Sequence, residues 1–353
     1  MENINIRTNG RGNAWPIPLG KEHAFYNQNQ FEEIANSSFS IISQNGEENE
    51  SEKINWEVLI DAGHGIIQYL IKENNRIPEA LFLTHPHIDH TISTDWIVQS
   101  YYRYNKKKFP VYATKLCWEF TLRSFSHLED MVEFHELKPG IETSVSEIEN
   151  MKLTAFPVYH GDNVLGSAML VVEIEDKKND KHKAIFSGDL LCPILRNIDI
   201  DFLSDAKVIY VDSNNRFPSI QTNHWSITSN EPNSKDISKK LSDYKKDLSY
   251  TRLISPHLKR KFDSETYSFF ESFLKENIIK TNVFMSVFEF LQELRIENTM
   301  LIHYSGNEDM KNYNQEVLGE DDLLKWTIEE AKLYRIKSKF FVPNIGHIFK
   351  LNN

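Results

Sequence analysis

Short apolar runs separated by polar and glycine-rich turns dominate the first half of the chain. Runs of about four to eight residues rich in β-branched and aromatic side chains are typical of strands, whereas apolar positions at helical spacing predict helices. We therefore expect strands at 4–7, 38–43, 56–60, 80–84 and 111–113. We expect helices at 66–73, 94–104 and 115–125. This alternation of strands and helices predicts packed layers of the two.

The strand pattern becomes stronger after residue 152. We expect strands at 153–158, 167–175, 184–187 and 208–211, and the polar tip 176–183 predicts a hairpin between the second and third of them. Strand-like and helix-like patterns return at 283–294, 300–303, 322–334 and 340–342. Between these regions, residues 232–280 are rich in Lys, Ser and Asp and helix-like in pattern. We interpret them as a helical insertion within a single domain that spans residues 1–353.

The charge balance disfavours a protein that coats nucleic acid. The chain has 353 residues, and 40 Lys and Arg against 51 Asp and Glu give a formal net charge of −11. Nucleic-acid-binding proteins usually present a basic face to the phosphates. We interpret the local basic clusters at 106–108 and 259–261 as solvated surface. Extended nucleic-acid binding is therefore not expected, whereas a small anionic substrate held by metal needs no basic face.

Cysteine content and hydropathy indicate a folded, reduced, cytoplasmic protein. Two cysteines, Cys117 and Cys192, are too few for a disulfide scaffold or a Cys-rich zinc module. No apolar run approaches the roughly 18 residues that a membrane span needs. The N-terminal residues lack the apolar core of a signal peptide. We therefore expect no membrane partner.

The segment LTHPHIDH at 83–90 carries the densest chemistry in the chain. It brings three imidazoles and a carboxylate together directly after an apolar run, from His85, His87, Asp89 and His90. Imidazole with carboxylate suits Zn, Mn or Fe in mixed nitrogen and oxygen coordination. His85 and His87 are two residues apart and can face one metal, while Asp89 and His90 lie in the following turn, positioned for a second metal. Histidines packed this densely repel one another on protonation, so the segment predicts a metal site.

HPHIDH matches the HxHxDH signature of the metallo-β-lactamase superfamily. Four further motifs stand in that family's order along the chain: Asp61 in LIDAGHG, His160 in FPVYHGD, Asp189 in IFSGDLL and His303 in MLIHYSG. The resemblance spans most of the chain. It implies an α+β fold, the four-layer αββα metallo-β-lactamase sandwich, here with a helical insertion.

The resemblance also implies a site for two divalent metal ions. The ligands would be His85, His87 and His160 for the first metal, Asp89, His90 and His303 for the second, and Asp189 as the bridge. Asp61 would orient the metal loops through hydrogen bonds. His347 also follows a β-like run and competes with His303, which we prefer because a Ser-Gly turn follows it. Zn is the favoured metal, and Mn and Fe also suit such ligands.

Several features are similar to the branch that contains tRNase Z and cyclic-nucleotide phosphodiesterases. These are the glycine-rich start GRGNAWP at 10–16 and the Asn-Ser-Ser at 36–38. The sequence NHWS at 223–226 resembles the motif that places a catalytic histidine in tRNase Z, and Asp212 stands where that enzyme's acidic partner stands. By this resemblance His224 would protonate the leaving alkoxide and Asp212 would orient it. A packing role for His224 beside an aromatic residue is the alternative.

The chain departs from tRNase Z in two features, and the first of them disfavours tRNA 3′ processing. Only 28 residues separate His160 from Asp189, where bacterial tRNase Z carries a long arm that grips tRNA. The segment 232–280 is extra to the usual core, and it could cap the site, form a homodimer contact, or do neither. The arrangement also resembles the PQQ-biosynthesis B protein, whose chemistry is oxidative, although the complete set of ligands for two metals favours hydrolysis.

The leading hypothesis is a metal-dependent phosphodiesterase. It would cleave a small nucleotide or cyclic-nucleotide phosphodiester with a metal-bridging hydroxide, and Asp89, His224 and Asp212 would be its catalytic residues. An ester, lactone or thioester hydrolase of the same fold is the second hypothesis. The third is a non-catalytic protein that keeps the metal site for structure.

Overall fold

The computed structural model describes residues 2–13, 35–45, 53–161, 164, 166–195, 197–219, 222–232 and 286–352, and the structural statements below concern these residues. The predicted insertion 232–280 and the basic cluster 259–261 lie outside them, except for residue 232. Residues 14–16 of the glycine-rich start also lie outside.

The first sheet contains seven strands in the described part of the chain, in the order β15-β1-β2-β3-β4-β5-β6. Pairs from β15 to β3 are antiparallel and pairs from β3 to β6 are parallel. Their bounds are β1 (Glu2–Gly10), β2 (Ser38–Asn45), β3 (Lys53–Ile60), β4 (Ala80–Phe82), β5 (Phe109–Ala113), β6 (Val132–Glu136) and β15 (Ile348–Lys350).

The second sheet has the order β11-β8-β9-β10-β12-β13-β14 among the described residues, and β7 pairs with β8. The pairs among β8, β9 and β10 are antiparallel, and those from β10 to β14 are parallel. The bounds are β7 (Glu142–Ser144), β8 (Met151–Tyr159), β9 (Ala168–Glu175), β10 (Lys181–Phe186), β11 (Cys192–Pro193), β12 (Val208–Asp212), β13 (Asn298–Ile302) and β14 (Lys339–Phe341).

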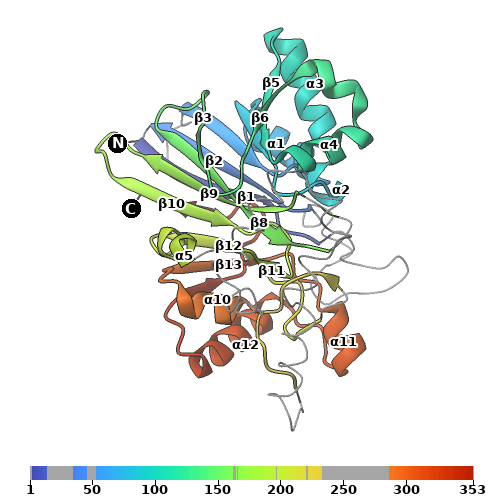
Figure 1. Ribbon diagram of the computed structural model, residues 1–353, viewed down its shortest axis with the longest axis vertical. Coiled ribbons are helices and arrows are strands. Elements are labelled where there is room, and N and C mark those ends of the chain that lie inside the picture. The colour runs from blue at the N-terminus through green and yellow to red at the C-terminus, as the bar shows by residue number, and fades with distance from the viewer. Residues whose placement is uncertain are drawn as a thin grey trace.

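Helices cover the outer face of each sheet. Those of the first half are α1 (Ile66–Glu73), α2 (Ile88–Thr91), α3 (Thr94–Asn105), α4 (Lys115–Ser124) and the 3₁₀ helix η2 (Ser126–Met131). Those of the second half are α5 (Asn197–Leu203), α10 (Val287–Glu293), α11 (Asn307–Tyr313) and α12 (Glu320–Leu333). Figure 1 shows α1, α3 and α4 at one end of the molecule and α10 and α12 at the other, with the sheets between them. No helix in the described ranges is long and apolar enough to cross a membrane.

Strands β3 and β12 bury side chains on both faces, and the alternation along each strand builds the layers. In β3, Val58 and Ile60 lie in the apolar cluster between the two sheets, while Leu59 lies in the cluster beneath the helices of the first half. In β12, Tyr210 lies in the cluster between the sheets and Ile209 lies in the cluster beneath α10 and α12. Because neighbouring side chains of a strand point to opposite faces, each sheet contacts helices on one side and the other sheet on its second side.

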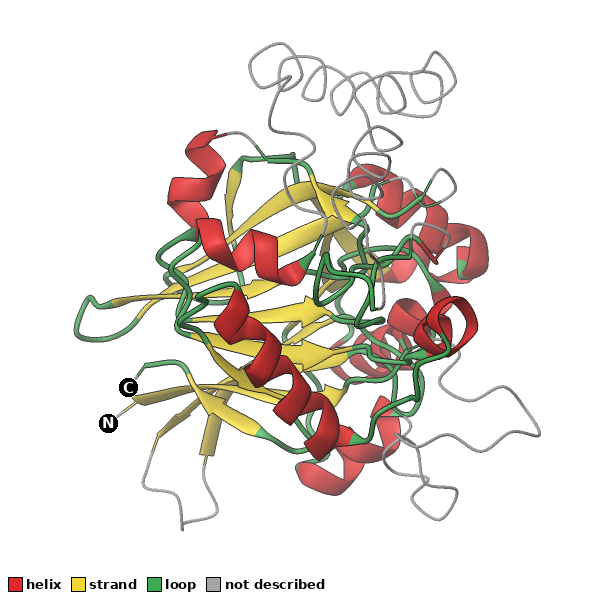
Figure 2. Ribbon diagram, turned by 90° about the horizontal axis from the view of Figure 1, so that it is seen from below, coloured by secondary structure: helices red, strands yellow, loops and turns green. Residues whose placement is uncertain are grey.

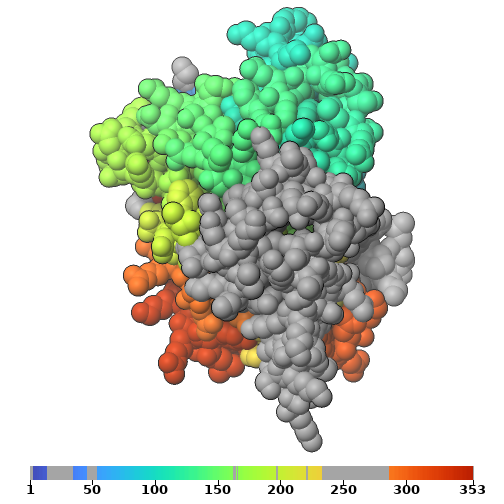
Figure 3. All heavy atoms as spheres, in the orientation of Figure 1, coloured from blue at the N-terminus to red at the C-terminus, as the bar shows by residue number. Residues whose placement is uncertain are grey.

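These three apolar clusters confirm the expected four-layer αββα sandwich. Figure 1 shows the sheets between the two groups of helices, and in Figure 2, which is turned by 90°, helices lie in front of and around the strands. In Figure 3 the blue-green atoms of the first half and the orange-red atoms of the C-terminal segment lie at opposite ends of the visible face. The cysteines are free and buried, with Cys117 in the cluster beneath the first-half helices.

Within the described residues the structure confirms the strand and helix positions that the pattern predicted and adds several short elements. Residues 283–285 of the segment expected at 283–294 lie outside the described residues. The helix expected at 66–73 is α1, and the polar tip joins β9 to β10 as a hairpin. The strand expected at 80–84 is shorter, because β4 ends at Phe82 and the backbone amide of Thr84 donates to a carboxylate oxygen of Asp61 instead. The pattern missed β6, since this edge strand carries charged residues and is only partly buried.

A buried ion pair connects the first three strands on the side that faces α1. The Arg7 guanidinium donates to Glu57 Oε1 at 2.7 Å, and the two side chains are 6% and 1% exposed. Ser40, on the strand between them, donates to the same carboxylate oxygen at 2.6 Å. The Arg7 guanidinium also lies 5.7 Å from the ring centroid of Tyr69 in α1. The pair therefore sets the register of three strands beneath a helix.

We expect Arg7→Met to destabilise the protein by about 3–5 kcal/mol, because it leaves the Glu57 carboxylate buried without its cation. The double variant Arg7→Met/Glu57→Leu should lose less, since it removes both charges together. Urea denaturation followed by circular dichroism, at constant metal concentration, measures both.

Lys152→Met is the matched control, because Lys152 pairs with Glu142 at an exposed site where both side chains are nearly half exposed. Its urea midpoint should stay at the wild-type value. A single variant no less stable than the double variant would contradict this role for the buried pair.

Candidate metal centre

The candidate ligands lie where strands end, at one edge of the two sheets. Strands β3 and β4 are parallel, as are β10, β12 and β13, and β8 runs in the same direction as β10 because both are antiparallel to β9. Their carboxyl ends therefore meet at one edge. The residues at or just beyond these ends are Asp61, His85, His160, Asp189, Asp212 and His303.

Asp61 holds the loop that follows β4. Its Oδ1 accepts a hydrogen bond from the backbone amide of Thr84 at 2.8 Å, and its Oδ2 accepts one from the Thr84 hydroxyl at 2.7 Å. The same Oδ2 lies 2.7 Å from His90 Nδ1. His90 therefore donates through Nδ1–H, and its Nε2 is turned toward the other candidate ligands. This is the hydrogen-bonding position that the sequence predicts for Asp61.

The first group of candidate ligands is His85, His87, His160 and Asp189. One nitrogen or oxygen of each lies within 4.8 Å of the others. His85 Nε2 is 3.6 Å from Asp189 Oδ2, and His160 Nε2 is 3.2 Å from His87 Nδ1. His160 Nδ1 donates to the carbonyl oxygen of Asn223 at 2.8 Å, which turns Nε2 toward the group. These four residues could hold one metal ion.

The second group is Asp89, His90, Asp189 and His303, also within 4.8 Å of one another. His303 Nε2 lies 3.4 Å from Asp89 Oδ2 and 3.3 Å from Asp189 Oδ2. His90 Nε2 lies 3.3 Å from Asp189 Oδ1. The Asp189 carboxylate therefore belongs to both groups, with Oδ2 near His85 and Oδ1 near His90.

Gly188 allows Asp189 to reach this position. It has a left-handed φ of +58°, and a Cβ atom there would lie 2.8 Å from Thr84 Cβ. Only glycine combines this backbone conformation with so close an approach. The turn that the sequence shows as Ser-Gly-Asp thus packs against the loop that carries the histidines.

Burial and neighbouring charges drive the pKa values of the histidines apart. Burial lowers the pKa of His85 well below its usual value, and burial with the nearby His224 lowers the pKa of His160 to about 3. Burial would also lower the pKa of His90, but the carboxylates of Asp189 and Asp61 outweigh it and raise that pKa well above normal. The site thus holds His85 and His160 as neutral imidazoles beside His90, whose protonated form the neighbouring carboxylates favour.

The chemistry of these groups fits divalent cations. The Nε2 atoms of His85 and His90 are buried and make no hydrogen bond to any residue that the structure describes. Buried nitrogens of this kind are normally satisfied. A cation would use both lone pairs and would balance the carboxylates of Asp89 and Asp189. The fold and its His/Asp clusters thus indicate divalent metal binding.

A third group lies beside the two groups of candidate ligands and consists of Asp212, His224 and His303. His224 Nδ1 lies 2.8 Å from Asp212 Oδ2, and the Asp212 side chain is fully buried. Burial would lower the pKa of His224, but Asp212 and Asp189 outweigh it and raise that pKa to about 9. The His224 ring stacks on the His303 ring, with centroids 5.1 Å apart. The structure therefore brings together the two residues that the sequence paired.

Three residues at this edge have strained backbone conformations. Asp61, Asn223 and His303 have φ values of 55°, 57° and 66°, in the left-handed region that non-glycine residues rarely adopt. Asp61 anchors the histidine loop, Asn223 supplies the carbonyl that orients His160, and His303 is a candidate ligand. Such conformations persist where the surrounding contacts determine them and are frequent at functional sites.

Sequence reasoning missed an amide network behind His303. Asn13 Nδ2 lies 3.3 Å from His303 Nδ1 and donates to Asn214 Oδ1 at 2.7 Å. Ser305 donates to the same Asn214 oxygen at 2.6 Å. The only available signal was position in the chain, because Asn214 closely follows β12 and Asn13 lies within the glycine-rich start at 10–16. His347, the competitor of His303, belongs to none of the three groups among the described residues.

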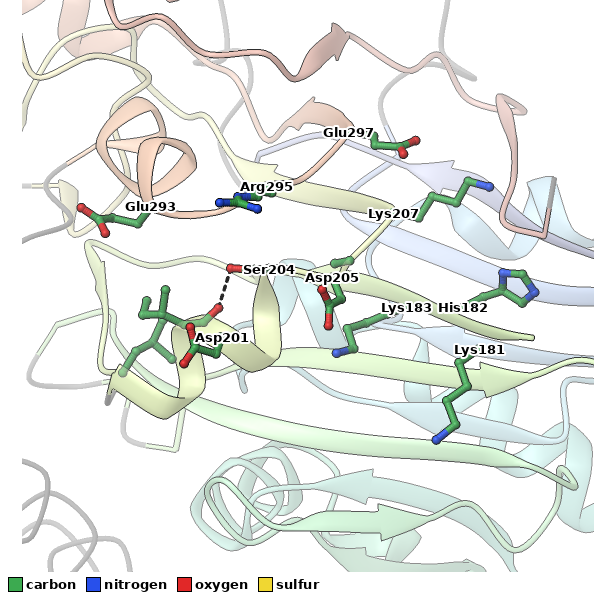
Figure 4. A pocket seen from close by; sticks show the side chains of 13 residues that line it. Lys181, His182, Lys183, Asp201, Ser204, Asp205, Lys207, Glu293, Arg295 and Glu297 are labelled. Atoms are coloured by element: carbon green, nitrogen blue, oxygen red, sulfur yellow. Dashed lines mark hydrogen bonds between the residues drawn. The ribbon is translucent and has the colours of Figure 1, made fainter. Parts of the chain in front are cut away.

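A cavity of about 710 Å³ opens onto the candidate ligands. Its walls include His87, Asp89, Asp189 and His224. A larger cavity of about 1060 Å³ lies at the amino ends of β10 and β12, the opposite sheet edge, and Figure 4 shows its mixed lysine, arginine and carboxylate lining. Because the candidate ligands all lie at the carboxyl edge, the smaller cavity is the candidate active site.

Comparison with known proteins agrees with the fold and the motifs. Residues 56–227, just under half of the chain, match the family described as Beta-lactamase superfamily domain. A comparison with curated proteins finds no sequence match.

Three solved structures share the fold at low sequence identity. A diphosphatase from the PhnP family is 13% identical with a TM-score of 0.59, covering 98% of this chain and 97% of its own. The metallo-β-lactamase-fold protein YhfI from Bacillus subtilis is 11% identical with a TM-score of 0.57, covering 99% of both chains. A long-form RNase Z from yeast is 11% identical with a TM-score of 0.50, covering 99% of this chain and 42% of its own. The chain therefore has the metallo-β-lactamase fold of that superfamily, as its HPHIDH signature predicted, and shares this fold with a PhnP-family diphosphatase and an RNase Z.

Proposed function

We propose that this protein is a metal-dependent hydrolase that cleaves a phosphodiester bond in a small nucleotide or cyclic nucleotide. One observation carries the proposal, namely that the Asp189 carboxylate belongs to two adjacent groups of buried imidazoles and carboxylates. Such a shared carboxylate suits a pair of divalent cations, for which Zn is our first choice and Mn and Fe are alternatives.

The proposed ligand sets follow the two groups. His85, His87 and His160 would hold one cation, Asp89, His90 and His303 the other, and Asp189 both. When bound, two such cations lower the pKa of water between them and neutralise charge on the attacked phosphate. Asp61 contributes by holding the His90 ring through Nδ1, and the Asn223 carbonyl does the same for His160.

His224 would serve as the general acid. Its Nδ1–H donates to Asp212, which leaves Nε2 as the nitrogen that can meet a substrate in the cavity that His224 lines. The Asp212 carboxylate raises the pKa of the ring, which favours a proton that His224 can give to a departing alkoxide. Asp212 is a positioning residue, because its Oδ2 is also hydrogen-bonded by the backbone amide of Leu190.

This acid pair supports a phosphodiesterase over an ester or lactone hydrolase. Alkoxides leave phosphorus poorly without a proton, so a positioned acid contributes most in that reaction. The diphosphatase and RNase Z that share the fold are named for phosphorus–oxygen bond cleavage, which is consistent with the proposal.

Asp189→Ala should remove both metal ions, because it removes a ligand that both groups share. His87→Ala should weaken one site more than the other, since His87 belongs to the first group alone. Metal content measured by mass spectrometry after gel filtration gives the number of ions, and bis(p-nitrophenyl) phosphate with added Zn or Mn gives the activity. We expect wild-type turnover that is lost in both variants.

Asp212→Asn is the matched control for metal content, because Asp212 lies outside the two proposed ligand sets. It should keep its metals. Wild-type protein with two bound metals that leaves cyclic and linear phosphodiesters untouched would overturn the proposed activity.

His224→Ala should slow substrates with poor alkoxide leaving groups by about 10²–10⁴-fold. The same variant should lose far less on p-nitrophenyl esters, because p-nitrophenolate leaves without a proton. The measurement compares kcat for a dinucleotide or cyclic nucleotide with kcat for a p-nitrophenyl phosphodiester. Equal losses on both classes would show that His224 is not the general acid.

A further inference from the structure

An exposed apolar ridge runs away from the candidate metal centre. α2 and α3 are nearly one helix, because Ile92 has φ −57° and ψ −36° and Ser93 has φ −81° and ψ −5°. Ile88, Ile92 and Trp96 follow one another at four-residue spacing and so lie on one side of it. Their side chains are 51%, 36% and 56% exposed. Figure 1 shows these two helices together at the same side of the first sheet.

The ridge begins inside the cavity that contains the candidate ligands. Ile88 and Ile92 line this cavity together with His87, Asp89 and His224. Ile88 stands between two proposed ligands in the chain and lines the same cavity as both of them. Single exposed apolar residues are ordinary. Three exposed apolar residues that follow one another along a helix and lead out of a candidate active-site cavity are typical of a surface that binds part of a ligand.

The remaining described lining of the cavity has the opposite character. It includes Asn214, Ser305, Asn307 and Glu308 from the second half of the chain. A substrate that fills both sides therefore needs hydrogen-bonding groups on one part and an apolar, preferably planar, surface on another. A nucleoside has both, because its sugar carries hydroxyls and its base has an apolar face.

We propose that Ile88, Ile92 and Trp96 bind the base of a nucleoside phosphodiester and thereby make the enzyme prefer such substrates to simple alkyl phosphodiesters. This inference rests on the proposed function for its substrate class. His224 acts on the leaving group, so the base belongs to the ester group that stays on the phosphate.

The test compares two substrates with the same leaving group, thymidine 5′-(p-nitrophenyl phosphate) and methyl p-nitrophenyl phosphate. In Ile92→Ser/Trp96→Ala we expect kcat/KM for the thymidine ester to fall about tenfold through KM, and kcat/KM for the methyl ester to stay within about twofold. Ile88 is left intact because it adjoins the proposed ligands. Ile71→Ser is the matched control, since Ile71 is 51% exposed on α1 and should leave both values unchanged.

A binding measurement separates this inference from the proposed function. Calorimetry on metal-replete protein should give a Kd for thymidine 5′-monophosphate about tenfold or more below that for methyl phosphate, and the double variant should lose this preference. If the protein shows this binding preference but hydrolyses none of the phosphodiesters, the proposed function is overturned and the ridge is supported as a base-binding surface. No preference in the wild type, or equal losses for both ligands in the variant, would overturn the inference.

Discussion

The Asp61 carboxylate is the contact on which the candidate site depends. It accepts hydrogen bonds from the backbone and hydroxyl of Thr84 and from His90, so the end of β3 and the loop after β4 form one unit. Four candidate ligands arise from that loop. Because all these groups are buried, each hydrogen bond lost would leave an unsatisfied polar atom that costs about 1–3 kcal/mol. These hydrogen bonds therefore fix the positions of the imidazoles.

The pKa values of the histidines in the site are not set by burial alone. Burial lowers the pKa of His85 and His160, whereas carboxylates raise the pKa of His90 and His224. Neighbouring groups of one residue type thus hold opposite protonation tendencies, which is typical of sites that carry out chemistry. The apolar clusters between and outside the sheets supply the stability, so the edge where the strands end can hold strained and charged residues.

The alternation of strand-like and helix-like segments predicted packed layers of the two, and the resemblance to the metallo-β-lactamase superfamily supplied the four-layer arrangement. The hydrophobic pattern missed short or partly exposed elements such as β6, since they bury too few side chains to produce a recognisable pattern. The proposed ligands could be named because HPHIDH is a dense local motif and because the resemblance to the metallo-β-lactamase superfamily supplied the order of the other motifs. The amide network of Asn13 and Asn214 could not, because single asparagines carry no signal of what they contact. The exposure of Trp96 could not be predicted either, since an aromatic residue at helical spacing usually indicates a buried position.

The amino-acid sequence alone was enough to identify the fold, the HPHIDH loop and the resemblance to a family with two metals. The alternation of strands and helices predicts packed layers, and the fold and the metal site follow from a series of short motifs that resembles one family. Only the tertiary structure decided that Asp189 reaches both groups of imidazoles and that His224 donates to Asp212. It also decided that Ile92 faces the cavity instead of the core. Each of these depends on segments far apart in the chain meeting at one sheet edge, and that meeting is set by packing, which no local pattern records.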